Sequence, residues 1–154
     1  YREWLANKVA LQILNDVRER FEREKQPEVI RNSSRIFRKI TGDRFERISA
    51  AMDKKEILVF DSRDSAKRID QLSRGTREQL LISLRLGFIE EYETHAEPLP
   101  VIVDEIFVNF DPERTRRTAE IFSDFAADRQ VIIFTCHPST AGYFDRKKIN
   151  AVSL

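Results

Sequence analysis

Two adjacent carboxylates, Asp104 and Glu105, directly follow an apolar run over residues 99–103. The run lacks polar alternation, which is typical of a strand that is covered on both faces in a parallel sheet. Ligands of open α/β sheets bind beyond the carboxyl ends of such strands. Asp104 and Glu105 both lie where they could contact such a ligand. A solvated acidic pair that merely ends a strand explains these two residues alone equally well.

Ser73 and Gly75 precede a helix that the hydrophobic pattern predicts from Thr76 onward. A small hydroxyl residue and a glycine at a helix start offer a hydroxyl, backbone N–H groups and the positive end of the helix dipole to an anion. Phosphate is a typical ligand of such a site. A serine cap with a turn glycine is the commoner explanation of an isolated Ser-x-Gly.

Two further polar residues lie at predicted element ends. Asp111 precedes Pro112, a pair typical of a helix start. His137 follows the apolar run 131–134, and an imidazole there could donate a hydrogen bond to a ligand. A lone histidine at a strand end is usually structural. We expect Cys136 to be a small packed residue without an activated thiol.

The pattern of a phosphate-cradling P-loop, G-x-x-x-x-G-K-S/T, does not occur in the sequence. None of the glycines is followed by lysine; they are Gly42, Gly75, Gly87 and Gly142. We therefore expect that this chain alone does not grip a β-phosphate strongly.

The apolar pattern predicts a helical entry followed by alternating strands and helices. Helices are expected at residues 4–24, 27–42, 76 to before Pro98, and 112–127, with a short one near residue 139. Strands are expected at residues 57–60 (in a hairpin that begins near Phe45), 99–103, 131–134 and 149–154, and a polar connector at 63–72. The helix from residue 76 should bury Leu80, Leu81, Leu84, Leu86, Phe88 and Ile89. The alternation of strands and helices indicates the α/β class.

Length and composition indicate one globular domain. The chain has 154 residues, of which 41% are hydrophobic and 34% are charged, and its net charge is +1. This balance gives no bulk electrostatic reason to bind nucleic acid or a membrane. No apolar run approaches the roughly 20 residues that span a bilayer. The single cysteine cannot form an internal disulfide, which suits a reducing compartment, and we expect a cytoplasmic protein.

One helix face could still meet phosphates locally. Its basic residues are Arg31, Arg35, Arg38 and Lys39. Because acidic residues are abundant nearby, a solvated helix face is the favoured interpretation, and a nucleic-acid contact is the alternative.

Four stretches stand in an order that resembles the C-terminal half of an ABC-type ATPase head of the SMC, RecN and RecF group, most closely its YhaN-like branch. They are residues 72–79, 101–105, 109–111 and 135–137. The resemblance implies an α/β, P-loop NTPase-like lobe over residues 27–154, with a largely parallel sheet flanked by helices. Residues 1–26 would be the helical stub of a coiled-coil arm. The Walker A segment would lie on a separate N-terminal lobe of the same protein, with this chain a fragment of it.

The resemblance also implies roles for individual residues. Asp104 matches the Walker B aspartate that holds Mg²⁺, Glu105 the base that polarises the attacking water, and His137 the switch histidine at the γ-phosphate. Ser73 and Gly75 match the signature segment, which closes over the γ-phosphate bound by the opposing head. The family's D-loop, which runs along the dimer interface, is matched by Asn109 and Asp111.

The function that the resemblance implies is ATP hydrolysis with Mg²⁺ between two heads, coupled to DNA repair or chromosome maintenance. DNA and a nuclease would then be partners, and the fragment alone would be inactive. The alternative is a non-catalytic dimerisation or DNA-binding platform. It is favoured by the missing P-loop, and by Arg74 and Thr76, where many family members have glycine and glutamine or glutamate. A third possibility is a metal-dependent nuclease that uses Asp104, Glu105 and Asp111.

Overall fold

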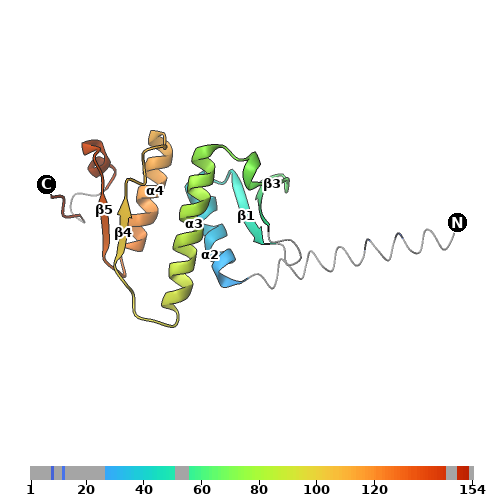
Figure 1. The fold of residues 1–154 in the computed structure, drawn as a ribbon, viewed down its shortest axis with the longest axis horizontal. Coiled ribbons are helices and arrows are strands. Elements are labelled where there is room, and N and C mark those ends of the chain that lie inside the picture. The colour runs from blue at the N-terminus through green and yellow to red at the C-terminus, as the bar shows by residue number, and fades with distance from the viewer. Residues whose placement is uncertain (1–7, 9–11, 13–26, 51–55, 145–148, 153–154) are drawn as a thin grey trace.

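The computed structural model describes residues 8, 12, 27–50, 56–144 and 149–152 (Figure 1). The helix expected at residues 4–24 lies outside this set except for Lys8 and Gln12, which are helical. The division between a stub and a lobe at residue 27 therefore stays a prediction.

The described residues from 27 onward form three α-helices, five strands and two short 3₁₀ helices. The helices are α2 (Glu28–Thr41), α3 (Arg74–Glu93) and α4 (Pro112–Phe125). The strands are β1 (Phe45–Ala50), β2 (Ile57–Asp61), β3 (Ala66–Arg68), β4 (Val101–Asp104) and β5 (Val131–Phe134). The 3₁₀ helices span Ile69–Gln71 and Pro138–Tyr143. This arrangement confirms the α/β class.

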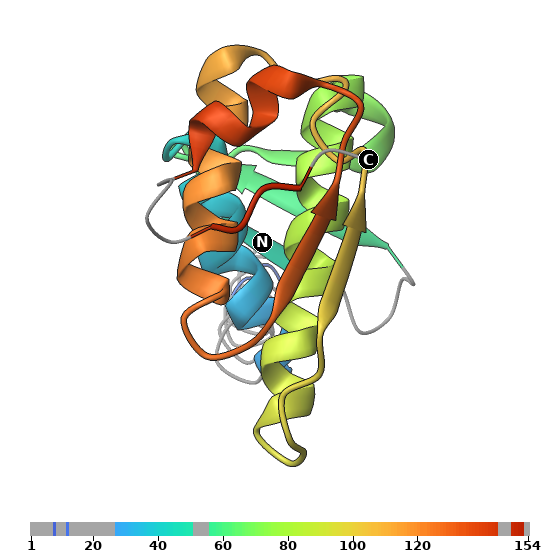
Figure 2. The same ribbon diagram turned by 90° about the vertical axis from the view of Figure 1, so that its left-hand side faces the viewer.

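The strands form two separate sheets. β1, β2 and β3 pair antiparallel, and β4 and β5 pair parallel, with Val101 opposite Val131 and Asp104 opposite Phe134. The parallel pairing expected for β4 and β5 is thus confirmed. Helices α2 and α3 lie between the antiparallel sheet and the β4–β5 pair with α4 (Figure 1), and Figure 2 shows β4 and β5 side by side.

A close approach of α2 and α3 depends on Gly87. A Cβ atom at this position would lie 2.6 Å from the backbone nitrogen of Ser33 and 2.9 Å from the carbonyl oxygen of Val29. α2 itself ends as predicted at Gly42, which adopts the left-handed conformation with φ of +62°. Glycine at these two positions therefore fixes how α2 packs and where it ends.

Two apolar clusters hold the elements together. One joins α2, α3, β4 and α4; its buried members include Ile40, Leu86, Val103, Phe107 and Phe122. The other joins α2 and α3 to the antiparallel sheet; its members are Phe37, Phe45, Ile48, Val59, Leu72 and Leu80. None of the helices in the described part of the chain is long and apolar enough to cross a membrane.

The predicted burial of several apolar residues is wrong. Leu81 and Phe88 on α3 are 48% and 60% exposed, and Ile102 on β4 is 68% exposed. Within the described residues, β4 is therefore open on one face, although its apolar sequence suits burial on both. An apolar run indicates that both faces of a strand suit burial. It does not identify the segment that packs against each face.

Two expectations about strands also fail. The strand predicted at 149–154 is not formed at residues 149–152, where Val152 is 78% exposed and no described strand pairs with the segment. The connector at 63–72 instead contains β3, a short edge strand that the sequence analysis missed. Two of its residues, Lys67 and Arg68, are charged, and charged side chains on an edge strand resist pairing with other molecules.

Candidate functional site

The predicted site residues fall into two groups. The strand-end group consists of Asp104, the last residue of β4, with Glu105 directly after it, and of His137 beyond the end of β5. Cys136, which was not predicted to be a site residue, belongs to the same group. Parallel pairing places these two strand ends at the same edge of the sheet, because Asp104 lies opposite Phe134. The structure thus brings Glu105 and His137 together from segments about thirty residues apart, as the resemblance implied.

Glu105 is held in an unusual conformation. Its φ is +46°, a left-handed value that is uncommon for residues other than glycine. Its backbone N–H donates to the carbonyl oxygen of Phe134 at 3.0 Å, and its carboxylate accepts a hydrogen bond from the backbone N–H of Cys136. Such conformations persist where the surroundings fix them, and they concentrate at functional sites. β5 and the residues after it therefore determine where the Glu105 carboxylate points.

The same contacts set the charges of the group. Hydrogen bonds from the backbone N–H and then the thiol of Cys136 lower the pKa of Glu105, and the charge of His137 lowers it further against the opposing effect of desolvation. The Glu105 carboxylate in turn raises the pKa of the Cys136 thiol, first by accepting its hydrogen bond. At neutral pH the pair is a carboxylate and a thiol. The expectation that Cys136 is packed is wrong, since its side chain is exposed.

Asp104 and His137 lie beside Glu105 with their side chains exposed to solvent. Both residues are exposed, and the Asp104 carboxylate makes no hydrogen bond or ion pair with any described residue. The His137 backbone N–H donates to the hydroxyl oxygen of Thr135 at 3.1 Å, which anchors the backbone and leaves the imidazole free. Carboxylate oxygens are the ligands that Mg²⁺ prefers, so the Asp104 side chain fits that ion.

The helix-start group consists of Ser73, Gly75, Asn109 and Asp111. Ser73 is the N-cap of α3: its hydroxyl oxygen accepts from the backbone N–H of Thr76 at 3.3 Å. Asp111 caps α4 in the same way, accepting from the backbone N–H of Arg114 at 2.9 Å. Both residues are thus ordinary helix caps, which does not prevent either from contacting a ligand as well.

Two contacts join the loop before α4 to the start of α3. The Asn109 side-chain amide donates to the Glu78 carboxylate at 2.8 Å. Gly75 is buried, and a Cβ there would lie 3.4 Å from the carbonyl oxygen of Asn109 and 2.6 Å from Nη1 of Arg114. The structure therefore brings Gly75 and Asn109 together. Glu78 and Arg114, which the sequence analysis missed, hold this junction.

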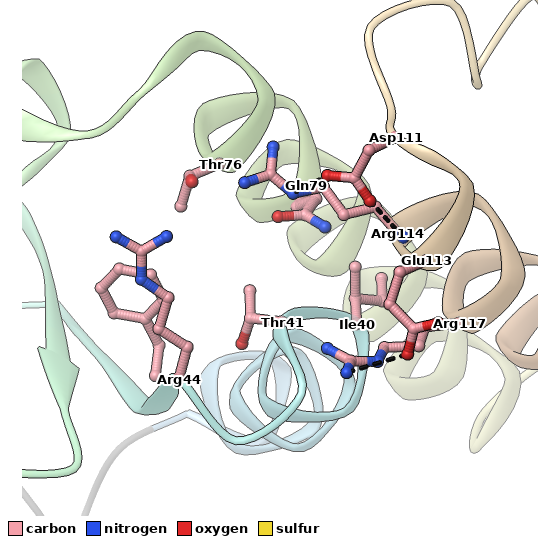
Figure 3. Close-up of a pocket in the computed structure, with 10 residues that line it drawn as sticks. Ile40, Thr41, Arg44, Thr76, Gln79, Asp111, Glu113, Arg114 and Arg117 are labelled. Carbon is pink, nitrogen blue, oxygen red and sulfur yellow. Dashed lines mark hydrogen bonds and ion pairs between the residues drawn. The ribbon is translucent and has the colours of Figure 1, made fainter.

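A cavity of about 270 Å³ lies behind the helix-start group (Figure 3). It is lined by Ile40, Thr41, Arg44, Phe45, Thr76, Gln79, Asp111, Glu113, Arg114 and Arg117. Two of its three arginines are paired, Arg114 with Asp111 at 3.1 Å and Arg117 with Glu113 at 3.0 Å. Arg114 and Arg117 are three residues apart, which places them on the same face of a helix. This spacing is the signal in the sequence that could have indicated the lining of the cavity.

The two groups are separate in the structure. No hydrogen bond or ion pair between described residues joins the strand-end group to the helix-start group. Asp111 belongs to the latter, so the three carboxylates of the nuclease alternative, Asp104, Glu105 and Asp111, do not form one cluster among the described residues. A nuclease site built on these three residues finds no support in this geometry.

The basic face of α2 is neutralised by acidic partners. The ion pairs are Arg31 with Glu28, Arg35 with Glu90, Arg38 with Asp43, and Lys39 with Asp124. The interpretation as a solvated face, rather than a nucleic-acid surface, fits these contacts.

Similarity to known sequences extends over nearly the whole chain. Protein YhaN of Bacillus subtilis, itself uncharacterized, is 26% identical over 149 residues, which cover 96% of this chain and 15% of YhaN. An uncharacterized protein of Mycobacterium tuberculosis is 38% identical over 71 residues, 46% of this chain and 8% of the relative. The chain thus spans a small part of the relatives that it matches. No protein-family model matches it.

Solved structures with a similar fold are SMC head domains. An SMC ATPase studied for ATP-driven dimerization and DNA-stimulated activation superposes with a TM-score of 0.63 at 19% identity, over 83% of this chain and 78% of that one. The Smc head of Pyrococcus furiosus bound to the C-terminal domain of ScpA gives 0.60 at 17% identity, over 92% and 37%. The SMC head of Thermotoga maritima gives 0.57 at 15% identity, over 84% and 45%. The resemblance is thereby confirmed: this chain has the fold of an SMC-like ATPase head and is similar in sequence to YhaN.

Proposed function

We propose that this chain is the C-terminal half of an SMC-like ATPase head that binds and hydrolyses ATP at an interface between two heads. The observation that carries the proposal is Glu105, an ionised carboxylate held at the end of a parallel strand with the His137 side chain beside it. The likeness to SMC heads supports the choice of ATP as the substrate.

The strand-end group would act on the nucleotide bound by its own head. Glu105 would polarise the attacking water and accept its proton, because its side chain is an ionised carboxylate at neutral pH. His137 would donate a hydrogen bond to the γ-phosphate. Asp104 would hold Mg²⁺, which when bound neutralises charge on the phosphate oxygens.

The helix-start group would act on the nucleotide of the opposing head. The N-terminus of α3 offers backbone N–H groups and a positive dipole end to a phosphate. The Ser73 and Thr76 hydroxyls lie 2.8 Å apart, and either can be the donor. When Thr76 donates, the Ser73 proton is free for a phosphate oxygen. Asn109 and Asp111 would meet the partner head beside this site.

Partners of the head follow from the same proposal. A second copy would supply the opposing helix-start group, and an N-terminal lobe would supply the missing P-loop. The exposed apolar face of β4, marked by Ile102, gives that lobe a surface to cover. We place the activity in DNA repair or chromosome maintenance, with DNA and a nuclease as further partners, because this is the context that the resemblance implies.

Glutamine in place of Glu105 tests the proposal. In the complete protein, Glu105→Gln should lower Mg-ATP turnover at least about 100-fold, because removing a general base typically costs a factor of about 10²–10⁴. The heads should then remain together as an ATP-bound dimer, detectable by size-exclusion chromatography with light scattering.

A matched control is Glu120→Gln, which removes an exposed carboxylate of α4 whose one ion-pair partner among the described residues is Arg116. Its turnover should stay close to that of the wild type. Wild-type turnover by Glu105→Gln would remove Glu105 from the reaction. Salt-dependent DNA binding without any nucleotide response would instead favour the non-catalytic platform.

A further inference from the structure

Three side chains at the strand ends form a donor set of mixed chemistry. Glu105, Cys136 and His137 each offer a ligand atom, and these atoms all lie within 4.8 Å of one another. It is the one group of three or more histidine, cysteine or acidic residues within that span among the described residues. Thiolate sulfur, imidazole nitrogen and carboxylate oxygen together are ligands typical of Zn²⁺. Mg²⁺ prefers oxygen ligands and has little use for a thiolate.

We propose that Glu105, Cys136 and His137 form a binding site for Zn²⁺ or a similarly thiophilic divalent cation, and that its occupation stops ATP hydrolysis. The cation site stands on the geometry of the three side chains. The inhibitory effect rests on the proposed ATPase function.

Backbone hydrogen bonds hold these residues in position in the absence of an ion. Glu105 and Cys136 are tied by the hydrogen bond from the Cys136 backbone N–H to Oε1 of the carboxylate. His137 is fixed at its backbone N–H by Thr135, whose hydroxyl lies 3.1 Å away. Cys136 and His137 are exposed, which gives an ion a path from solvent. Three protein ligands leave a coordination position for water, as in zinc sites that are not closed.

Binding exchanges protons for the cation. The Cys136 thiol loses its proton to solvent as the sulfur–metal bond forms, and His137 must be neutral to coordinate. No oxidation or reduction takes place. Because binding releases the thiol proton, affinity should rise with pH.

Occupation would remove two groups from the reaction at once. A carboxylate that coordinates a cation is a poor base for water, and an imidazole bound to a cation cannot donate from the same nitrogen to a phosphate. Asp104 lies next to the site but is not part of the cluster. Excess Mg²⁺ should therefore compete weakly for it, because the soft ligands do not suit that ion.

The cation site can be tested on the 154-residue chain itself. The chain has one cysteine and two histidines, so a thiolate–metal signal can come only from Cys136. Under reducing conditions, Co²⁺ should produce a thiolate-to-cobalt charge-transfer band that Zn²⁺ then removes. Cys136→Ser should abolish the band, and Cys136→Ser and His137→Asn should each weaken Zn²⁺ binding at least about tenfold in competition with a chromogenic chelator.

His95→Asn is the matched control, because it removes the other histidine, which is exposed and lies near Glu91 on α3. This variant should keep the band and the affinity, and circular dichroism should show every variant folded. Absence of the cobalt band in the folded wild-type chain, or equal Zn²⁺ affinity in wild type and Cys136→Ser, would overturn the site.

The inhibitory effect is tested in the complete protein. Each protein's Mg-ATP turnover with Zn²⁺ is divided by its own turnover without Zn²⁺, so that any change in the basal rate cancels. Cys136→Ser should need at least about tenfold more Zn²⁺ than the wild type for the same inhibition. Equal inhibition of both, or full turnover with Zn²⁺ bound, would overturn the inhibitory effect. Absence of turnover in the zinc-free wild type would overturn the ATPase function and the inhibition together, whereas the cobalt band and the Zn²⁺ affinities decide the site.

Discussion

The strand-end group and the helix-start group use their polar atoms differently. The side chains of Asp104 and His137 make no hydrogen bond or ion pair with a described residue, and Glu105 is held in a left-handed conformation with hydrogen bonds to its neighbours. In the helix-start group, by contrast, Ser73 and Asp111 each cap a helix. One group presents reactive atoms on a fixed backbone, and the other presents a helix terminus whose own polar groups are mostly satisfied.

This difference indicates that the strand-end group carries the reactive side chains and that the helix-start group provides a binding surface. A group with exposed carboxylates and an imidazole can transfer protons and bind cations. A capped helix start can recognise an anion through its backbone and dipole, and its side chains mainly keep it in place. Changes in the first group should therefore alter activity more than stability. Changes in the helix-start group should mainly alter stability. They should alter activity only where they change the contact with the nucleotide of the opposing head.

Gly87→Ala should have the largest effect on stability, because it disturbs the packing that holds α3 and its start. The added Cβ would meet the backbone of Ser33 and Val29 at less than 3.0 Å. Overpacking costs about 1–3 kcal/mol or more, and the gain in helix propensity of about 1 kcal/mol offsets part of it. Because the clash is with backbone atoms, we expect a cost of about 3 kcal/mol, so that the free energy of unfolding measured with urea falls by about 2 kcal/mol.

Gly142→Ala is the control for that measurement. Nothing lies within 4 Å of a Cβ built at Gly142, so the same chemical change should leave stability nearly unaltered. Equal unfolding midpoints for the two variants would show that α2 and α3 can separate without cost.

Ser73→Ala should have an intermediate effect. Loss of the cap of α3 should cost about 1 kcal/mol of unfolding free energy. Ser73→Asp separates the two roles of this residue, because aspartate caps a helix well but its charge repels a phosphate. This variant should regain most of the stability and still lose ATP turnover in the complete protein. Normal turnover by Ser73→Asp would make Ser73 a structural cap only.

The smallest effect concerns pH. Hydrogen bonds from Cys136 lower the pKa of Glu105 below 4.5 in the folded chain. The folded state therefore favours the charged carboxylate, and the resulting stabilisation is present above pH 4.5 and is lost as pH falls through the lowered pKa. The stability difference between wild type and Glu105→Gln should shrink over this range in denaturant titrations. A difference that is constant with pH would mean that the Cys136 contacts do not stabilise the charged form.

Much of the fold could be predicted from local pattern. Gly42 ends α2, Pro112 begins α4 as expected, and the apolar runs of β4 and β5 pair parallel. These features are encoded within a few residues of each other by conformational preference or periodicity. β3 escaped prediction because an edge strand buries little and so carries no apolar signature. The exposure of Ile102 escaped it because burial depends on a covering surface, which a run of apolar residues does not specify.

The sequence predicted part of the candidate site, but neither the contributions of Cys136, Glu78 and Arg114 nor the geometry. The order of the motifs identified Glu105, His137, Ser73 and Gly75. Nothing local could reveal the left-handed φ of Glu105, since that value depends on the end of β5. The cation cluster likewise needs Cys136 to be exposed rather than packed, and this is decided by the turn after β5.

The central claim is that two heads share each ATP site, and a mixed dimer of the complete protein tests it most directly. One subunit carries Glu105→Gln and the other Ser73→Arg, with different tags so that only mixed dimers are purified. If Ser73 serves the opposing head, one of the two sites in this dimer is intact. We predict Mg-ATP turnover severalfold above that of either variant alone. A mixed dimer as inactive as the single variants would contradict the shared site.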